Sequence, residues 1–159
     1  MQQVLIGSLR TPKALVSQLF EVRQVIEPAI AEYAGAPRLL EMRSYTTPEG
    51  QIAALDARFR DHTLKLFEKH GMTNMTYWNL AADQKGAKSP YVAGNTLIYL
   101  LHHESEAAAK TSFDAFRADP TWIAAKEASE KKAGGSLTIA QPDGVKSEFL
   151  VPTDYSPVK

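Results

Sequence analysis

The stretch that decides the fold is residues 96–103, which read Thr-Leu-Ile-Tyr-Leu-Leu-His-His. Successive side chains of a strand point to opposite faces, so this run presents apolar groups on both faces. Such a pattern is typical of a strand in the interior of a sheet that is covered on both sides. We therefore predict a central strand over residues 96–103.

Strand patterns recur on both sides of this segment. Residues 39–47 alternate in polarity, and residues 72–80 are dense in Thr, Tyr and Trp. Two further strand candidates follow, a short one over residues 136–140 and another over residues 145–151. A tight turn over residues 141–144 joins these two strands. The sequence therefore predicts a sheet built around residues 96–103.

Two helical regions separate these strands. The first starts at Thr47-Pro48, stops at His70-Gly71 and has an apolar stripe at spacings of three and four, formed by Ile52, Leu55, Phe59, His62 and Leu66. The second starts at the capping residue Ser105, breaks at Asp119-Pro120 and continues to residues 134–135.

Residues 1–37 predict a separate amphipathic helix. Threonine and proline at residues 11 and 12 suit a helix start, apolar residues then follow at helical spacing, and residues 35–37 end the helix. We expect two regions, a helical arm over residues 1–37 and a main domain over residues 38–159.

The main domain has the order β-α-β-β-α-β, which is the ferredoxin-like split βαβ motif with an antiparallel sheet. If both helical regions pack on one face, the second apolar face of residues 96–103 is left in water. Pairing of two copies, sheet against sheet, covers that face, and closed two-fold dimers are the commonest oligomers. We predict an α+β homodimeric barrel.

Composition excludes several classes of protein. Eighteen basic residues balance eighteen acidic ones, which disfavours nucleic-acid binding, and the absence of cysteine excludes disulfides and thiolate metal sites. Charged residues interrupt every apolar run, so we expect neither an integral membrane protein nor a signal peptide. The expected location is cytoplasmic.

Several motifs resemble the NIPSNAP family. They are residues 40–50 (LEMRSYTTPEG), 58–63 (RFRDHT), 67–72 (FEKHGM), 116–122 (FRADPTW) and 150–157 (LVPTDYSP). The resemblance covers residues 39–158 and implies a dimeric α+β barrel. It implies little about activity, because bacterial-type members have no agreed reaction. Residues 4–10 also resemble short peptides that direct cargo into encapsulin shells, which would make such a shell a partner.

His62 is the first candidate site residue, because it falls on the apolar stripe of the first helix between Phe59 and Leu66. An unpaired buried imidazole costs about 1–3 kcal/mol, so it needs a partner or a cavity. Two interpretations stay open: a hydrogen-bonded core histidine, and a ligand-binding or catalytic acid/base residue.

Glu41, Arg43 and Tyr45 form the second candidate group, since alternation places them on one face of a central strand. Buried charges are seldom unpaired. The group is either a structural ion pair at a dimer interface or an arginine that binds a carboxylate or phosphate, with Tyr45 as a further donor.

Aromatic and histidine residues supply the remaining candidates. Trp78 and Trp122 are candidates for the wall of an apolar pocket, whereas we expect Tyr99 to belong to the core. His102 is a candidate ligand-binding residue, by analogy to barrel haem enzymes. His102 and His103 point to opposite faces of one strand and cannot share a metal, so we expect neither a metal nor a cofactor.

Two hypotheses for function follow. The first is a dimeric barrel that binds a small, largely apolar organic molecule near His62, Tyr45 and Arg43, with or without cofactor-independent catalysis. The second is a non-enzymatic interaction, cargo or scaffold protein that uses the dimer surface and the arm. The sequence leaves open whether the protein is an enzyme.

Overall fold

A computed structural model describes residues 39–86 and 91–157 of the chain. All the described elements lie in the compact unit Arg38–Lys159. The predicted helical arm and the encapsulin-like peptide at residues 4–10 fall outside the described residues, so both stay predictions. No helix among the described residues is long and apolar enough to cross a membrane.

Four strands form one antiparallel sheet in the order β2-β3-β1-β4. They are β1 (Leu39–Thr46), β2 (Thr73–Asn79), β3 (Thr96–His103) and β4 (Val145–Leu150). β3 and β1 occupy the two central places and pair along their whole length, from Leu39 opposite His103 to Thr46 opposite Thr96. The predicted α+β fold and the interior position of residues 96–103 are confirmed.

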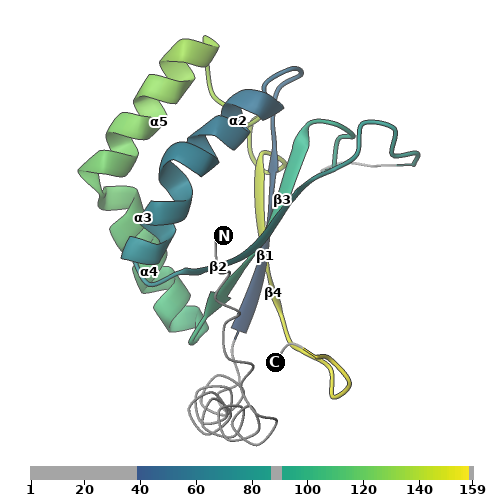
Figure 1. Ribbon diagram of the computed structural model, residues 1–159, viewed down its shortest axis with the longest axis vertical. Helices are drawn as coiled ribbons and strands as arrows, with labels where there is room; N and C mark the ends of the chain where they lie inside the picture. Colours follow the sequence, from purple (N-terminus) through teal and green to yellow (C-terminus); the bar gives the residue numbers. More distant parts are fainter. Residues whose placement is uncertain (1–38, 87–90, 158–159) are drawn as a thin grey trace, which may run out of the picture. The chain divides into compact units, whose positions relative to one another are not determined.

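The helices cover one face of this sheet (Figure 1). They are α2 (Ile52–Arg58), the π-helical turn η1 (Phe59–Thr63), α3 (Leu64–Lys69), α4 (Glu106–Ala118) and α5 (Pro120–Ala133). The Ser105 hydroxyl accepts from the amide of Ala108 at 3.1 Å, as its predicted capping role requires. The core between helices and sheet centres on Tyr99, whose ring lies 5.1–6.1 Å from those of Tyr45, Phe59, Phe67 and Tyr77.

The prediction that His62 lies on the buried face of the first helix is wrong. In η1 the amide of Leu64 donates to the carbonyl of Phe59, five residues back, so the turn contains one extra residue. The inward position that a regular spiral would give to His62 falls instead on Thr63, which is buried and donates to the carbonyl of Arg58 at 3.2 Å. His62 is exposed to solvent.

Two other local predictions are also corrected. The first helix begins at Ile52, because residues 47–50 form a turn in which Gln51 N–H donates to the Pro48 carbonyl. Residues 136–140 are not a strand: the Ser136 hydroxyl bonds the backbone of Thr138, which competes with strand pairing. Leu137 of this segment is fully buried in the core.

Asp119 ties the end of α3 to the corner between α4 and α5. Its Oδ2 atom accepts from Lys69 Nζ at 2.6 Å and lies 2.8 Å from His70 Nε2, while Oδ1 accepts from the amide of Thr121 at 2.8 Å. These hydrogen bonds, led by those of Lys69 and His70, hold the pKa of the Asp119 carboxyl well below its ordinary value. The carboxylate therefore stabilises the folded state.

Replacing Asp119 by Asn is expected to lower the melting temperature at pH 7 by several degrees and to flatten its acid dependence. The unfolded chain takes up a proton at Asp119 near pH 4, about its ordinary pKa, whereas the folded chain does so only at lower pH. Stability from this group is therefore complete above about pH 5 and is lost as pH falls toward the folded pKa. Thermal melts from pH 2 to pH 7 measure the melting temperature of each variant, and Asp83→Asn, at an exposed position, is the control. The same dependence of melting temperature on pH in both variants would contradict the prediction.

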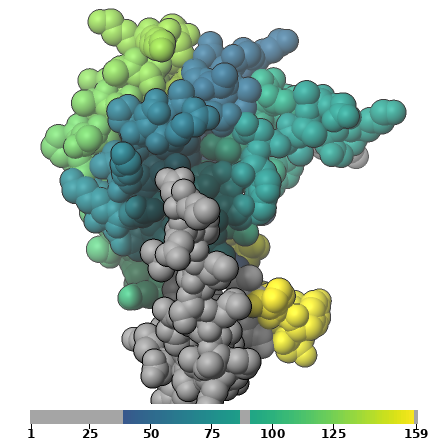
Figure 2. Space-filling model, viewed as in Figure 1, coloured from purple at the N-terminus to yellow at the C-terminus, as the bar shows by residue number. Residues whose placement is uncertain are grey.

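The sheet face opposite the helices carries a row of apolar side chains. It is formed by alternate residues of the four strands, among them Leu40, Met42, Trp78, Ile98, Leu100 and Leu150. Trp78 is 54% exposed, and Met42, Ile98 and Leu100 are half-buried. Beyond β4 the chain stands out from the domain in Figure 2, where Val151 and Tyr155 are largely exposed.

Candidate functional site

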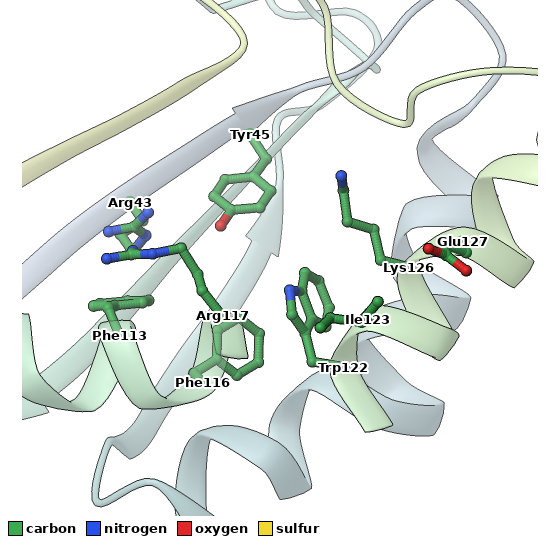
Figure 3. A pocket seen from close by; sticks show the side chains of 9 residues that line it. All are labelled: Arg43, Tyr45, Phe113, Phe116, Arg117, Trp122, Ile123, Lys126 and Glu127. Atoms are coloured by element: carbon green, nitrogen blue, oxygen red, sulfur yellow. The ribbon is translucent and has the colours of Figure 1, made fainter. Parts of the chain in front are cut away.

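A pocket of about 410 Å³ lies between β1 and the helices α4 and α5. β1 contributes Arg43 and Tyr45, and the helices contribute the other lining residues, namely Phe113, Phe116, Arg117, Trp122, Ile123, Lys126 and Glu127. Figure 3 shows the Tyr45 hydroxyl pointing into the space between Arg43 and Trp122. The pocket thus has aromatic walls and a cationic, phenolic end.

Arg43 is held in place by a buried carboxylate. Its Nη1 atom donates to Glu41 Oε1 at 2.5 Å, and its Nε atom donates to the Tyr99 hydroxyl at 3.1 Å. The guanidinium carbon also lies 4.3 Å from the centre of the Phe113 ring. Glu41 and Arg43 thus form an ion pair on the helix side of the sheet, and ligand binding by Arg43 stays a prediction.

Glu41 is 2% exposed and is the centre of a wider network. His103 Nε2 lies 2.8 Å from Glu41 Oε2, and the Ser147 hydroxyl donates to Oε1. Burial raises the pKa of Glu41, but the hydrogen bond from His103 and the charge of Arg43 outweigh burial and lower it. Glu41 is therefore an ionised group that fixes the position of Arg43.

Tyr45 and Tyr99 place two hydroxyl groups beside Arg43, and the hydroxyl of Tyr99 is neutral. Tyr99 is fully buried, and burial raises its pKa well above the ordinary value, against the opposing charge of Arg43. Burial lowers the pKa of Arg43, but Tyr99, Tyr45 and Glu41 raise it overall. The guanidinium thus stays charged beside the protonated Tyr99 phenol, an arrangement that can bind or stabilise an oxyanion.

Two of the charges at the rim of the pocket are already paired. Arg117 Nη2 lies 2.5 Å from Asp114 Oδ1, and Lys126 Nζ lies 3.7 Å from Glu130 Oε2. These side chains are at least half exposed, apart from Glu130. Exposed pairs of this kind contribute at most about 1 kcal/mol. The inner charge, Arg43, therefore matters more for a ligand than the rim.

The structure brings together three of the predicted site residues and separates the other three. Arg43, Tyr45 and Trp122 line one pocket. Trp78 lies on the edge strand β2 and lines a second pocket of about 280 Å³. His102 is buried in β3 but belongs to the sheet face opposite the helices, and His62 is exposed.

Sequence reasoning missed the helical contributions of Phe113, Phe116 and Arg117 to the pocket. The helical spacing of the two phenylalanines is typical of core residues, and both are buried. What the spacing could not show is that α5 turns away at Asp119-Pro120 and leaves one side of these rings open to the pocket. Among the described residues no cluster of three or more His, Asp or Glu side chains could hold a metal.

The family model described as NIPSNAP matches residues 40–157, about three quarters of the chain. The chain belongs to the NIPSNAP family. The resemblance seen in the motifs is thereby confirmed.

Solved structures of NIPSNAP proteins share the fold. A NIPSNAP family protein of unknown function from Agrobacterium tumefaciens is 15% identical, with a TM-score of 0.59 over 79% of this chain and 96% of that one. An uncharacterised NIPSNAP domain protein from Burkholderia xenovorans is 19% identical, with a TM-score of 0.55 over 75% of this chain and 98% of that one. No curated protein matches the chain. Identities this low show a shared fold and carry no assignment of function.

Proposed function

We propose that this NIPSNAP protein binds a small, largely apolar organic molecule in the pocket between β1 and the helices α4 and α5. The observation that carries the proposal is the position of Arg43 and Tyr45 at one end of an aromatic cavity of about 410 Å³. Ligand sites are typically concave and mostly apolar, with a few convergent polar groups, and this volume suits a small organic molecule.

The polar end of the ligand would be bound by Arg43 and Tyr45. Glu41 and Tyr99 hold the guanidinium before any ligand arrives, so little ordering of the side chain remains to be done on binding. The rings of Phe113, Phe116 and Trp122 would contact the apolar part. If the ligand reacts, these groups can stabilise an oxyanion or enolate formed on it, without a cofactor.

The binding unit would be a homodimer in which two copies pair through the sheet face opposite the helices. Support comes from the apolar side chains on that face, Met42, Ile98 and Leu100, and from the 54% exposure of Trp78. Exposed apolar patches of this kind mark interaction surfaces. A second copy supplies the same surface by symmetry, so one patch covers the other.

The pocket can be tested with a built-in fluorescent reporter. The chain has two tryptophans, so Trp78→Phe leaves Trp122, which lines the pocket, as the single tryptophan. Small aromatic and aliphatic compounds, each with and without an acid group, are titrated into this full-length protein. In that background Ile123→Phe, which fills the pocket, is expected to weaken binding by about tenfold or more, equivalent to about 1.4 kcal/mol.

Ala124→Phe is the matched control, because Ala124 is the exposed neighbour of Ile123 on α5 and does not line the pocket. It adds a phenylalanine ring at the adjacent position and is expected to leave binding unchanged. Equal weakening by both changes, or no response of Trp122 to any compound, would contradict the proposal.

A further inference from the structure

Arg58 is a buried cation in which two of the three guanidinium nitrogen atoms make no hydrogen bond within the described residues. It is the last residue of α2, and its side chain is only 3% exposed. Its Nε and Nη1 atoms have no hydrogen-bond partner within the described residues. The acid beside it, Glu130, lies 3.5 Å from Nη1, close enough for attraction without a hydrogen bond.

Such a side chain is unfavourable for folding alone. A guanidinium in a protein interior normally satisfies its donors, and donors left without partners keep the full cost of losing water. Burial lowers the pKa of Arg58, against the opposing charge of Glu130. An apolar residue such as methionine would fill this position without that penalty.

Arg58 lies directly behind the wall of the proposed binding pocket. Its guanidinium carbon is 5.3 Å from the centre of the Trp122 ring, and Trp122 lines the pocket. In Figure 3 the Tyr45 hydroxyl and the Trp122 ring bound the same space. The donors without partners therefore lie close to a ring that lines the cavity.

We propose that Arg58 is a second anion-binding residue of this pocket and that the ligand is an organic carboxylate. Its carboxylate accepts hydrogen bonds from Arg58 when the Trp122 ring shifts aside, while its apolar body stays against Phe113 and Phe116. Arg43 and Tyr45 bind a second polar group of the ligand or the outer carboxylate oxygen. This inference rests on the proposed function, since it specifies the ligand class of the same pocket.

The experiment compares phenylacetate with its uncharged counterpart 2-phenylethanol, using Trp122 fluorescence in the Trp78→Phe protein. Phenylacetate is expected to bind at least tenfold more tightly. Arg58→Met is expected to reduce this difference severalfold, leaving the part that Arg43 contributes, and to raise the melting temperature of the ligand-free protein. Arg58→Lys keeps the charge and is expected to retain part of the preference, and Glu130→Gln is expected to leave it intact or increase it.

Several outcomes would overturn the role of Arg58. One is equal binding of the two compounds, with binding of both blocked by Ile123→Phe. That result would support the pocket and contradict the preference for a carboxylate. Another is an unchanged preference for phenylacetate in Arg58→Met. If Arg58→Met and Glu130→Gln also lower the melting temperature by similar amounts, Arg58 is a structural partner of Glu130. If Arg58→Met does not fold, an unchanged preference in Arg58→Lys combined with a lost preference in Glu130→Gln overturns it. Failure of both compounds to bind would instead count against the pocket itself.

Discussion

Replacing Glu41 by Leu is expected to destabilise the domain by about 3–5 kcal/mol, the usual effect of removing one partner from a buried ion pair. Glu41 is the acceptor for Arg43, His103 and Ser147, and it is almost fully buried. Without it, the Arg43 guanidinium keeps its charge and loses its acceptor. Chemical denaturation followed by circular dichroism measures the change in the free energy of unfolding.

Two further variants separate charge from packing. Ser147→Ala removes one hydrogen bond of Glu41 at an exposed position and is expected to cost about 1 kcal/mol or less. The double change of Glu41 and Arg43 to Leu is expected to recover much of the stability lost by Glu41→Leu, since no unpaired charge remains. A double variant that loses the sum of two large single effects would contradict the assignment of Glu41 and Arg43 as a coupled pair.

Replacing Leu100 by Glu is expected to convert a dimer into monomers. Leu100 lies at the middle of the sheet face opposite the helices, where it pairs with Met42 and Thr76. In a two-fold dimer each change occurs twice, and losing about 2 kcal/mol of apolar burial per copy weakens association about a thousandfold. Native mass spectrometry and light scattering measure the oligomeric state.

Ala128→Glu is the control, because Ala128 is exposed on α5, on the helical side of the domain. It adds the same charge without touching the sheet and is expected to leave the dimer intact. A monomeric unsubstituted protein would remove the dimer from the proposal while leaving the pocket between β1, α4 and α5 in place.

Patterns of apolar residues were sufficient to predict the four strands of the sheet and the order of strands and helices along the chain. Residues 96–103 are apolar on both faces, and this marks an interior strand whatever surrounds it. The same alternation predicted that Glu41, Arg43 and Tyr45 share a face, and the structure confirms their proximity through the Glu41–Arg43 pair. Local periodicity was therefore sufficient to predict the fold and the two residues that β1 contributes to the pocket, Arg43 and Tyr45.

Features that depend on contacts distant in sequence could not be predicted in this way. His62 was placed inside because the spacing of a regular helix was assumed, and the pattern Phe-Arg-Asp-His-Thr carries no signal for an extra residue in the turn. Arg58 stands three residues after Leu55, so a regular helix would also bring it near the buried face. Its charge argued against burial, and only the packing of α5 across α2 shows that it is enclosed.

The wide turn at Phe59–Thr63 also limits how the protein can be altered by insertion or deletion. Because this turn absorbs one extra residue, removing one residue from it would restore a regular spiral and leave the faces of the later residues nearly unchanged. A deletion within α2 would instead rotate everything after it by about 100° about the helix axis, so that Leu66 and Phe67 would leave the core and Asn74 would lose its hydrogen bond to the Leu64 carbonyl. Chimeras that join this chain to a relative should therefore place any difference in helix length within residues 59–63.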